Sequence, residues 1–313
     1  MKKVLISVLF ILFIVVSIIF SIFKEDVYSA NLFYMDTYIN VKVVTTKSKG
    51  EKALKDIENI FKKYENLTNR YSESELSKIN NKVGTFEVSE ELFDILKVSV
   101  DWYYKSDGLF NVNIGNIVDV WKRYRENKNG VPSLSELDQD ISIENIKFED
   151  NKVIVNNANI DLGAIVKGYV TNVIKEYLEE NEIKNYIVNA GGNVLVGEKK
   201  DKFKVGIENP DGGILEVLNI NNSCIVTSGG KERYYEYDGV KYHHIIDPVT
   251  KYPANHMKSV TVITDDCTKA DILSTTLFLM PIEDGIKFIE DDVDVLWYSN
   301  DNKIIKSEGF NYE

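Results

Sequence analysis

Imidazole and thiol side chains are scarce in this chain of 313 residues, which contains three histidines and two cysteines. The histidines stand at positions 243, 244 and 256, so a metal site built on imidazole ligands has little support. Outside the cell, Cys224 and Cys267 could form a disulfide. Two cysteines so far apart in the sequence are a weak signal, however, and we expect two free, buried thiols.

Clusters of basic residues are also missing. The formal net charge is −12, and no run of lysine or arginine interrupts the excess of acidic residues. Proteins that bind nucleic acids carry basic surfaces that attract phosphate groups. The composition therefore argues against a nucleic-acid partner.

One long apolar run stands out, at residues 4–23, with two lysines before it and charged residues at 24–26. About twenty apolar residues can cross a hydrocarbon core of roughly 30 Å as a helix. A cleaved signal peptide usually has a shorter apolar part, of about 7–15 residues. We therefore predict an N-terminal transmembrane or signal helix within residues 1–26, followed by one domain at residues 27–313.

The two lysines favour an N-terminus inside the cell, because positive flanks stay on the cytoplasmic side. That orientation predicts a single-pass protein of the cell membrane, with residues 27–313 on the extracytoplasmic side. The sequence Val-Tyr-Ser at 27–29 leaves cleavage by a signal peptidase open as an alternative. The segment has no cysteine that could be acylated.

The remaining sequence predicts an α+β fold. Apolar residues spaced by three and four predict helices, and β-prone runs between turn residues predict strands. The expected helices are at 51–67, 89–104, 164–179 and 268–280, and the expected strands at 152–155, 160–162, 186–196 (two strands around Gly191 and Gly192), 203–207 and 260–264. Residues 125–151 are polar and predict a loop with at most a short helix. Without a regular β–α–β order, we expect mixed or antiparallel sheets with packed helices.

A β-hairpin is expected at residues 232–247, because Asp238 and Gly239 separate two aromatic-rich, β-prone runs. This dipeptide favours a two-residue type I′ turn. The turn would pair Tyr237 with Val240, Tyr235 with Tyr242, and Arg233 with His244. Alternation along the strands then places Tyr235, Tyr242 and His244 on one face and His243 on the other.

The expected helix at 268–280 carries a candidate magnesium site. Asp271, Ser274 and Thr275 follow each other at spacings that put one carboxylate and two hydroxyls on the same face. Hard cations such as magnesium prefer oxygen ligands, with the rest of the shell supplied by substrate or water. The alternative is structural, because serine and threonine within helices often hydrogen-bond back to a carbonyl of the preceding turn.

Residues 161–168, Asp-Leu-Gly-Ala-Ile-Val-Lys-Gly, carry a candidate phosphate site. A strand is expected to end here and a helix to begin, with Lys167 near the helix N-terminus, where free N–H groups attract anions. The segment lacks the spaced glycines and the Lys-Ser/Thr pair of a Walker loop. A short connection with a solvated lysine is the alternative.

Further candidates are individually weak. Gly191-Gly192 and Ser228-Gly229-Gly230 would allow a backbone to approach a ligand, or would only allow a turn. His244 has an unperturbed pKa of about 6.5, which suits a general base. A packed, hydrogen-bonded histidine is the alternative.

Taken in order, these segments resemble the ApbE-type flavin transferases, the FAD:protein FMN transferases. The resemblance covers nearly everything after residue 31. The matching segments are Met35-Asp36-Thr37, Arg70-Tyr71-Ser72 with Ser74 to Ser77, 107–113, 161–169, 188–193, 227–229, 242–248 and 270–275.

The resemblance implies a role for individual residues. Those matching contacts to FAD, the substrate, are Met35, Tyr71, Val112, Asn113, Ile114, Asp161, Lys167 and Ile245. The residues matching ligands of Mg²⁺ are Asp271, Ser274, Thr275 and Ala164, the last through its carbonyl. His244 matches a histidine important for transfer. This chain departs from the family pattern at Asp36, where glycine is usual, and at Asn111, Asn113, Asn116-Ile117 and Lys251.

The resemblance also implies an activity. The chain would transfer the FMN part of FAD to a threonine or serine hydroxyl of an exported or membrane flavoprotein, such as a subunit of a redox complex, and release AMP. Two alternatives stay open: a magnesium-dependent FAD pyrophosphatase, and a non-catalytic extracytoplasmic FAD-binding protein.

Overall fold

The computed structural model describes residues 9, 10, 12, 13 and 24–312 of the chain. An eight-stranded sheet forms its centre, and neighbouring strands are antiparallel throughout, in the order β1-β2-β6-β7-β10-β13-β14-β15. Its strands are β1 (Glu25–Tyr34), β2 (Thr37–Thr46), β6 (Asn185–Ala190), β7 (Asn193–Val196), β10 (Ser223–Gly229), β13 (Met257–Thr264), β14 (Asp294–Ser299) and β15 (Ile304–Lys306).

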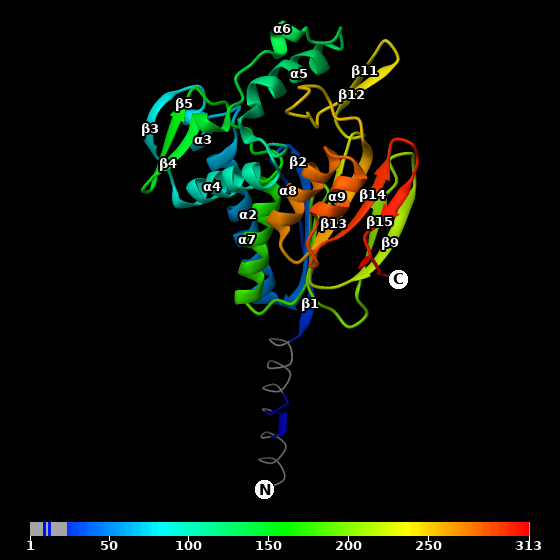
Figure 1. Cartoon of the computed structure of the whole chain (residues 1–313). Helices are drawn as coiled ribbons and strands as arrows, with labels where there is room; N and C mark the ends of the chain where they lie inside the picture. The colour runs from blue at the N-terminus through cyan, green and yellow to red at the C-terminus, as the bar shows by residue number, and fades with distance from the viewer. Residues whose placement is uncertain (1–8, 11, 14–23, 313) are drawn as a thin grey trace.

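Alternation along the strands divides the apolar side chains of this sheet between two cores. Val226 and Val262 belong to the larger core, whereas their neighbours Ile225 and Ile263 belong to the smaller one. The helices α2 (Lys47–Thr68), α7 (Val166–Glu180) and α8 (Cys267–Phe278) pack on the side of the larger core (Figure 1). The hairpin of β8 (Phe203–Glu208) and β9 (Ile214–Ile220) covers the smaller one.

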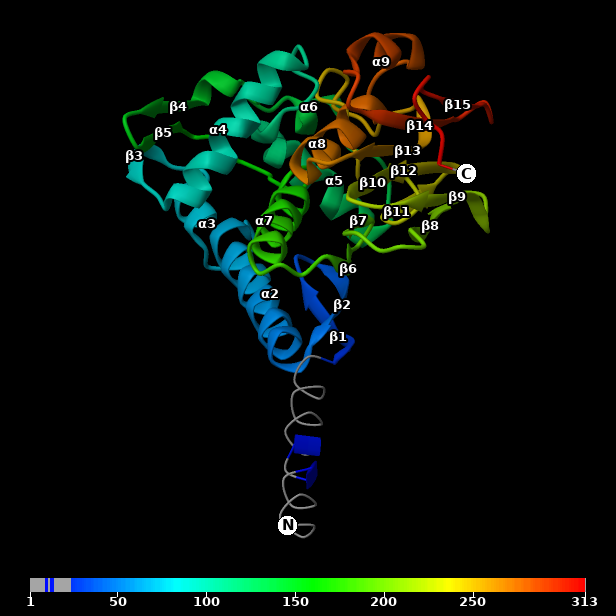
Figure 2. The same cartoon turned by 90° about the horizontal axis from the view of Figure 1, so that it is seen from below.

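The other elements surround this centre. A three-stranded sheet of β3 (Val83–Glu87), β5 (Lys152–Asn156) and β4 (Ile146–Glu149) lies beside α3 (Glu75–Ile79) and α4 (Glu90–Lys105) (Figures 1 and 2). A third apolar cluster, which includes Ile117, Trp121 and Tyr235, joins α5 to β11. The elements at that end are η1 (Val112–Ile114), α5 (Gly115–Asn127), α6 (Leu134–Leu137), η2 (Ile143–Asn145), β11 (Tyr234–Tyr237) and β12 (Val240–His243), and α9 (Ile282–Phe288) follows α8.

Most of the expected elements are present, so the α+β prediction is confirmed. The four expected helices correspond to α2, α4, α7 and α8, with ends shifted by a few residues. The two strands around Gly191 and Gly192 are β6 and β7, and the hairpin at Asp238-Gly239 is β11–β12. Its ladder pairs Tyr237 with Val240 and Tyr235 with Tyr242, as predicted.

Other predictions of elements were wrong. Residues 160–162 are not a strand, because Ile160 N–H donates to the side chain of Asn80 and Asp161 N–H to the carbonyl of Val112, instead of to a neighbouring strand. The supposed loop at 125–151 contains the strand β4 as well as α6. Helix α5 and the long hairpin β1–β2 were not predicted.

The N-terminal prediction lies largely outside the described residues, since 1–8, 11 and 14–23 are not among them. Within the described part of the chain, no helix is both long and apolar enough to cross a membrane. Strand β1 begins at Glu25, and the residues of the alternative cleavage sequence, 27–29, pair with β2.

The prediction of two free thiols was wrong, because Cys224 and Cys267 form a disulfide. Antiparallel pairing of β10 and β13 sets Cys224 opposite Thr264, and the chain turns from there into α8, which begins at Cys267. The two Cα atoms therefore lie 5.1 Å apart despite a sequence separation of 43 residues. The bond ties β10 to the first turn of α8.

Candidate functional site

The predicted metal residues lie where the first turns of α7 and α8 meet. A Cβ atom on Gly168 would lie 2.4 Å from the carbonyl oxygen of Cys267 and 2.5 Å from Cβ of Asp271. Because glycine has no Cβ, the helices approach closely enough for Gly168 N–H to donate to Oδ2 of Asp271 at 2.8 Å. Asp271 is 3% exposed. Its carboxylate therefore caps one of the free N–H groups at the start of α7.

Three hydroxyl groups accompany this carboxylate. Ser274 Oγ donates to the backbone carbonyl of Asp271 at 2.9 Å. This bond to the preceding turn of the helix is the structural alternative named for the serine and threonine of this segment. Ser228, from β10, adds a hydroxyl whose Oγ lies 2.8 Å from Ser274 Oγ and 3.3 Å from Thr275 Oγ1. The strand and the helix thus bring the hydroxyls of Ser274, Thr275 and Ser228 together, one turn along α8 from Asp271.

This donor set fits a hard cation that takes the rest of its ligands from substrate and water, since all of its atoms are oxygen and one is an ionisable carboxylate. Among residues 24–312 no three or more His, Cys, Asp or Glu side chains form a metal-binding group. Of the four predicted ligands, only Asp271 supplies a carboxylate. Ala164, the predicted carbonyl ligand, is half-buried and lies two residues before α7.

A second group of residues centres on Arg70, whose side chain is 7% exposed. One of its terminal nitrogens donates to Asp161 Oδ2 at 2.8 Å and to the hydroxyl of Tyr71 at 3.2 Å. The other donates to Asp119 Oδ2 at 2.7 Å, to Asn159 Oδ1 at 2.8 Å and to the carbonyl of Gly115 at 3.1 Å. Burial alone would lower the pKa of Arg70, but its acidic partners raise that pKa above the ordinary value.

Asp161 and Tyr71, two predicted FAD contacts, are therefore neighbours in the structure. Asp161 Oδ1 accepts the N–H of Gly163 at 2.8 Å, so both of its oxygens already have a partner within the protein. Tyr71 is half-exposed, its hydroxyl lies 3.3 Å from Asp119 Oδ1, and Lys122 Nζ lies 3.6 Å from the centre of its ring. Tyr71 thus presents an aromatic ring at the surface beside two cations.

The predicted contacts at 112–114 are mostly buried. The Asn113 side chain is 1% exposed and is fully engaged, since its oxygen accepts from Asn159 N–H at 2.9 Å and its amide donates to the Ser142 carbonyl at 2.8 Å. Val112 is 2% exposed.

Met35 lies in the turn between β1 and β2. Both Met35 and Asp36 have positive φ, 54° and 55°, a region that favours glycine and that aspartate tolerates better than most residues. This conformation accounts for the departure at Asp36, where the related pattern usually has glycine. Met35 N–H donates to Glu65 Oε1 at 2.8 Å, and Arg233 donates to the Asp36 carbonyl at 3.3 Å, so the turn is anchored to α2 and to the segment before β11.

The two adjacent histidines differ in their surroundings. His243 is a packed residue: its Nε2 lies 2.9 Å from the Ala254 carbonyl, its Nδ1 accepts Ile245 N–H at 3.2 Å, and its ring lies edge-on against Phe278. His244 follows the end of β12, so the predicted pair with Arg233 does not form. Its Nδ1 atom is buried without a hydrogen-bond partner.

Burial lowers the pKa of His244 to about 3, with further lowering by Arg233, His243, Arg125 and Lys167. The imidazole is therefore neutral at pH 7, with cationic side chains around it. Burial and the neighbouring Arg233 also lower the pKa of Arg125. Arg125 was not predicted as a site residue. The only signal in the sequence is its position one turn after Trp121 in the segment that forms α5. Ile245, a predicted FAD contact, directly follows His244 in the chain and is 8% exposed.

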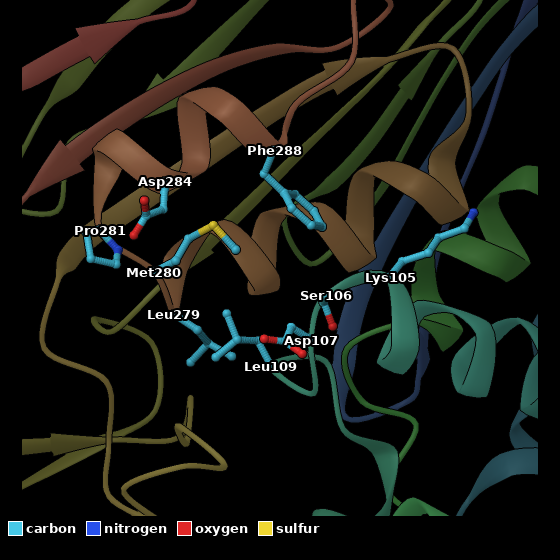
Figure 3. A pocket seen from close by; sticks show the side chains of 9 residues that line it. All are labelled: Lys105, Ser106, Asp107, Leu109, Leu279, Met280, Pro281, Asp284 and Phe288. Carbon is cyan, nitrogen blue, oxygen red and sulfur yellow. The ribbon is translucent and has the colours of Figure 1, made fainter.

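Figure 3 shows a pocket of about 340 Å³ between the end of α4 and the α8–α9 junction. Leu109, Leu279, Met280 and Phe288 make it largely apolar, and Asp107 and Asp284 also line it. None of the predicted site residues lines it.

The geometry agrees with comparisons to known proteins. A curated relative from Klebsiella pneumoniae, named FAD:protein FMN transferase, is 30% identical over 90% of this chain and 92% of its own length. One from Vibrio cholerae with the same name is 31% identical over 82% of each chain. The crystal structure of the ApbE protein of Thermotoga maritima superposes with a TM-score of 0.83 at 30% identity, covering 91% of this chain and 98% of that one. The flavin transferase ApbE of Vibrio cholerae gives 0.81 at 27% identity, covering 92% and 99%. The model of the ApbE family matches residues 35–297, and the chain belongs to this family.

Proposed function

We propose that this chain is a magnesium-dependent FAD:protein FMN transferase that modifies a threonine or serine of an exported or membrane flavoprotein. The observation that carries the proposal is the buried carboxylate of Asp271, which is held against the start of α7 and is followed one turn along α8 by hydroxyls that meet that of Ser228. Its relatives' shared name supports the flavin chemistry. The metal, the acceptor hydroxyl and the release of AMP are our extension to this chain.

Asp271, Ser274, Thr275 and the carbonyl of Ala164 would hold the magnesium ion. When bound, the ion would neutralise negative charge on the diphosphate of FAD. Lys167, in the first turn of α7, would add a fixed positive charge near the free N–H groups of that helix. Arg125 and Arg233, which both lower the pKa of His244, would extend this positive field.

His244 is suited to accept the proton of the acceptor hydroxyl, because its ring is neutral and one buried nitrogen has no partner. Its low pKa makes it a weak base in the free protein. Burial is the main cause of that low pKa, and the surrounding positive charges lower it further; the entry of a diphosphate would offset these charges and so raise the pKa. We therefore expect His244 to act as a base only when FAD is bound.

The reaction would be a phosphoryl-type displacement. The hydroxyl oxygen of the acceptor forms a bond to the phosphorus of the FMN half, and the bond from that phosphorus to the bridging oxygen breaks. AMP leaves with the bridging oxygen, and the hydroxyl proton passes to His244. Such a transfer depends mainly on positioning and on stabilisation of charge.

We further propose that the domain acts outside the cell membrane, anchored by the N-terminal apolar run. The disulfide between Cys224 and Cys267 supports this location, because disulfides persist in oxidising compartments and are rare in the cytosol.

The test uses the full-length chain in detergent with FAD, Mg²⁺ and an exported flavoprotein fragment from the same organism that carries a candidate threonine. The readouts are the intact mass of the fragment and the release of AMP. A gain of one FMN unit supports transfer. AMP and free FMN without labelling would instead indicate a pyrophosphatase, and FAD that stays bound and intact would indicate a binding protein.

One variant and a matched control test the metal assignment. Asp271→Asn keeps an oxygen acceptor for Gly168 N–H but removes the charge, so we expect a folded protein with activity lower by at least about a thousandfold, since metal ions contribute several kcal/mol to such reactions. The matched control is Asp150→Asn, an exposed aspartate in the turn between β4 and β5, away from both groups of site residues. Full magnesium-dependent activity in Asp271→Asn would refute the metal assignment.

A further inference from the structure

We propose that Arg70 is a positioning residue for FAD binding: it fixes the Tyr71 ring and the Asp161 carboxylate in one arrangement, and through Asp161 it sets the turn that opens α7. The inference rests on the proposed function and deepens it. Neither the sequence pattern nor the family relationship in hand gives Arg70 a role of its own.

The first argument is the number of elements that Arg70 joins. Its five hydrogen bonds reach the residue beside it, the start of α5 and the segment before α7. The fork of a guanidinium can donate in several fixed directions at once, which an ammonium group cannot do. Arg70 is thus a junction between parts of the chain that no helix or strand connects.

The second argument is the space reserved for the guanidinium. A Cβ atom on Gly115 would lie 2.7 Å from Arg70 Nη2 and 2.4 Å from the carbonyl oxygen of Asn159. Glycine at this position therefore lets α5 begin directly against the arginine. Asn159 is held on its other side as well, since its amide donates to Asn116 Oδ1 at 2.8 Å.

The third argument is the path from Arg70 to the metal residues. Asp161 accepts from Arg70 through one oxygen and from Gly163 N–H through the other, at 2.8 Å each. Gly163 and Ala164 lead into α7, where Gly168 donates to Asp271. A shift of Arg70 would therefore alter the turn at Gly163, whereas α7 itself stays held by the bond from Gly168 to Asp271.

Arg70 itself does not contact the reacting atoms in this arrangement. All of the bonds that the structure gives its terminal nitrogens go to protein groups, and its side chain is 7% exposed. Its loss should therefore weaken the binding of FAD more than it slows the chemical step. This split between KM and kcat separates positioning from catalysis.

The experiment compares Arg70→Lys with the wild-type protein, as full-length chains in detergent, in the FMN-transfer assay. Lysine keeps the positive charge between Asp161 and Asp119, so the fold should survive, but it cannot reproduce the fork. Loss of one or two charged hydrogen bonds should raise KM for FAD about ten- to a hundredfold, with kcat changed by less than about threefold. The matched control is Arg123→Lys, an exposed arginine on α5 that pairs with Glu136, which should leave KM unchanged.

A double-mutant cycle with Asp161→Asn excludes a merely structural effect. If Arg70 acts through Asp161, Arg70→Lys should raise KM much less in the Asp161→Asn protein than in the wild type. Unchanged KM in Arg70→Lys, or effects that multiply independently in the cycle, would overturn the inference. A wild-type protein that neither binds FAD nor labels the acceptor would instead refute the proposed function.

Discussion

The two halves of the candidate site are held in different ways. Around Asp271, α7 and α8 are in backbone contact at Gly168, and Asp271 and Ser274 are almost completely buried. Around Arg70, the backbone of Gly115 also contacts that of Asn159, but the functional groups are joined mainly by side chains, and Asp119 and Tyr71 remain open to solvent. The first half has almost no freedom to adjust, whereas the second can reorganise its side chains.

This difference suits the two tasks that we propose. A metal site with a single carboxylate needs its ligands fixed, because few protein atoms determine its geometry. A site that admits a large dinucleotide benefits from groups that can move aside at the surface. Substitutions in the first half should therefore have larger effects than substitutions in the second.

Apart from substitution of the predicted metal ligands themselves, the largest effect is expected from Gly168→Ala. The added methyl group would require Cys267 and Asp271 to move away, although alanine is otherwise a better helix former than glycine. A displacement of this kind should reduce FMN transfer by at least about a hundredfold and lower the free energy of unfolding by about 1–3 kcal/mol. Labelling kinetics and urea unfolding measure the two effects.

The control for this substitution is Gly285→Ala in α9. Its Cβ would lie 3.3 Å from a side-chain carbon of Leu277, so small adjustments can accommodate it. Transfer should stay within about twofold of wild type. If Gly168→Ala were equally harmless, the close contact of α7 and α8 would not be what positions Asp271.

An intermediate effect is expected from His244. Its pKa is about 3 in the folded protein, because of burial and then of nearby positive charge, and about 6.5 when unfolded. Below pH 6.5, His244 therefore binds a proton in the unfolded chain but stays neutral in the folded protein. Stability must fall as the pH drops from about 6.5 toward 3, by up to about 1.4 kcal/mol per pH unit.

The comparison with His244→Gln isolates this contribution from that of the carboxylates and of His243. Urea unfolding of both proteins between pH 7 and pH 4 should show the wild type losing more stability than the variant. A parallel decline of the two curves would mean that His244 is accessible to protons in the folded state. Added FAD should reduce the difference, because it raises the pKa of His244 in our proposal.

Local patterns made part of this structure predictable. Helical spacing placed Asp271, Ser274 and Thr275 on one face, and the Asp238-Gly239 turn determined the register of β11 with β12. Both depend on residues close together in the sequence. The β1–β2 hairpin was missed because its turn places Met35 and Asp36 at positive φ without the Asn-Gly or Asp-Gly signature of such turns.

Contacts between distant segments were not predictable from one sequence. Ser228 approaches Ser274 because β10 packs against α8, and the disulfide results from the pairing of β10 with β13. Arg70 lies in a recognisable segment, Arg70-Tyr71-Ser72, but its partners at 115, 119, 159 and 161 come from elsewhere in the chain. Which residues line the site is determined by the fold. The spacing of residues in the sequence alone does not predict them.

The smallest effect is expected from Tyr71→Phe, which tests how adaptable the Arg70 half is. The hydroxyl lies 3.2 Å from Arg70 Nη1 and 3.3 Å from Asp119 Oδ1, and the residue is 53% exposed, so water can replace both contacts. KM for FAD should rise by about two- to fivefold, as expected for a hydrogen bond worth about 0.5–1 kcal/mol. The control is Tyr104→Phe, which removes an exposed hydroxyl bonded to Glu144 at 2.9 Å away from the site and should leave KM unchanged. An increase well above tenfold in Tyr71→Phe would show that this hydroxyl binds FAD directly and that the two halves of the site are equally rigid.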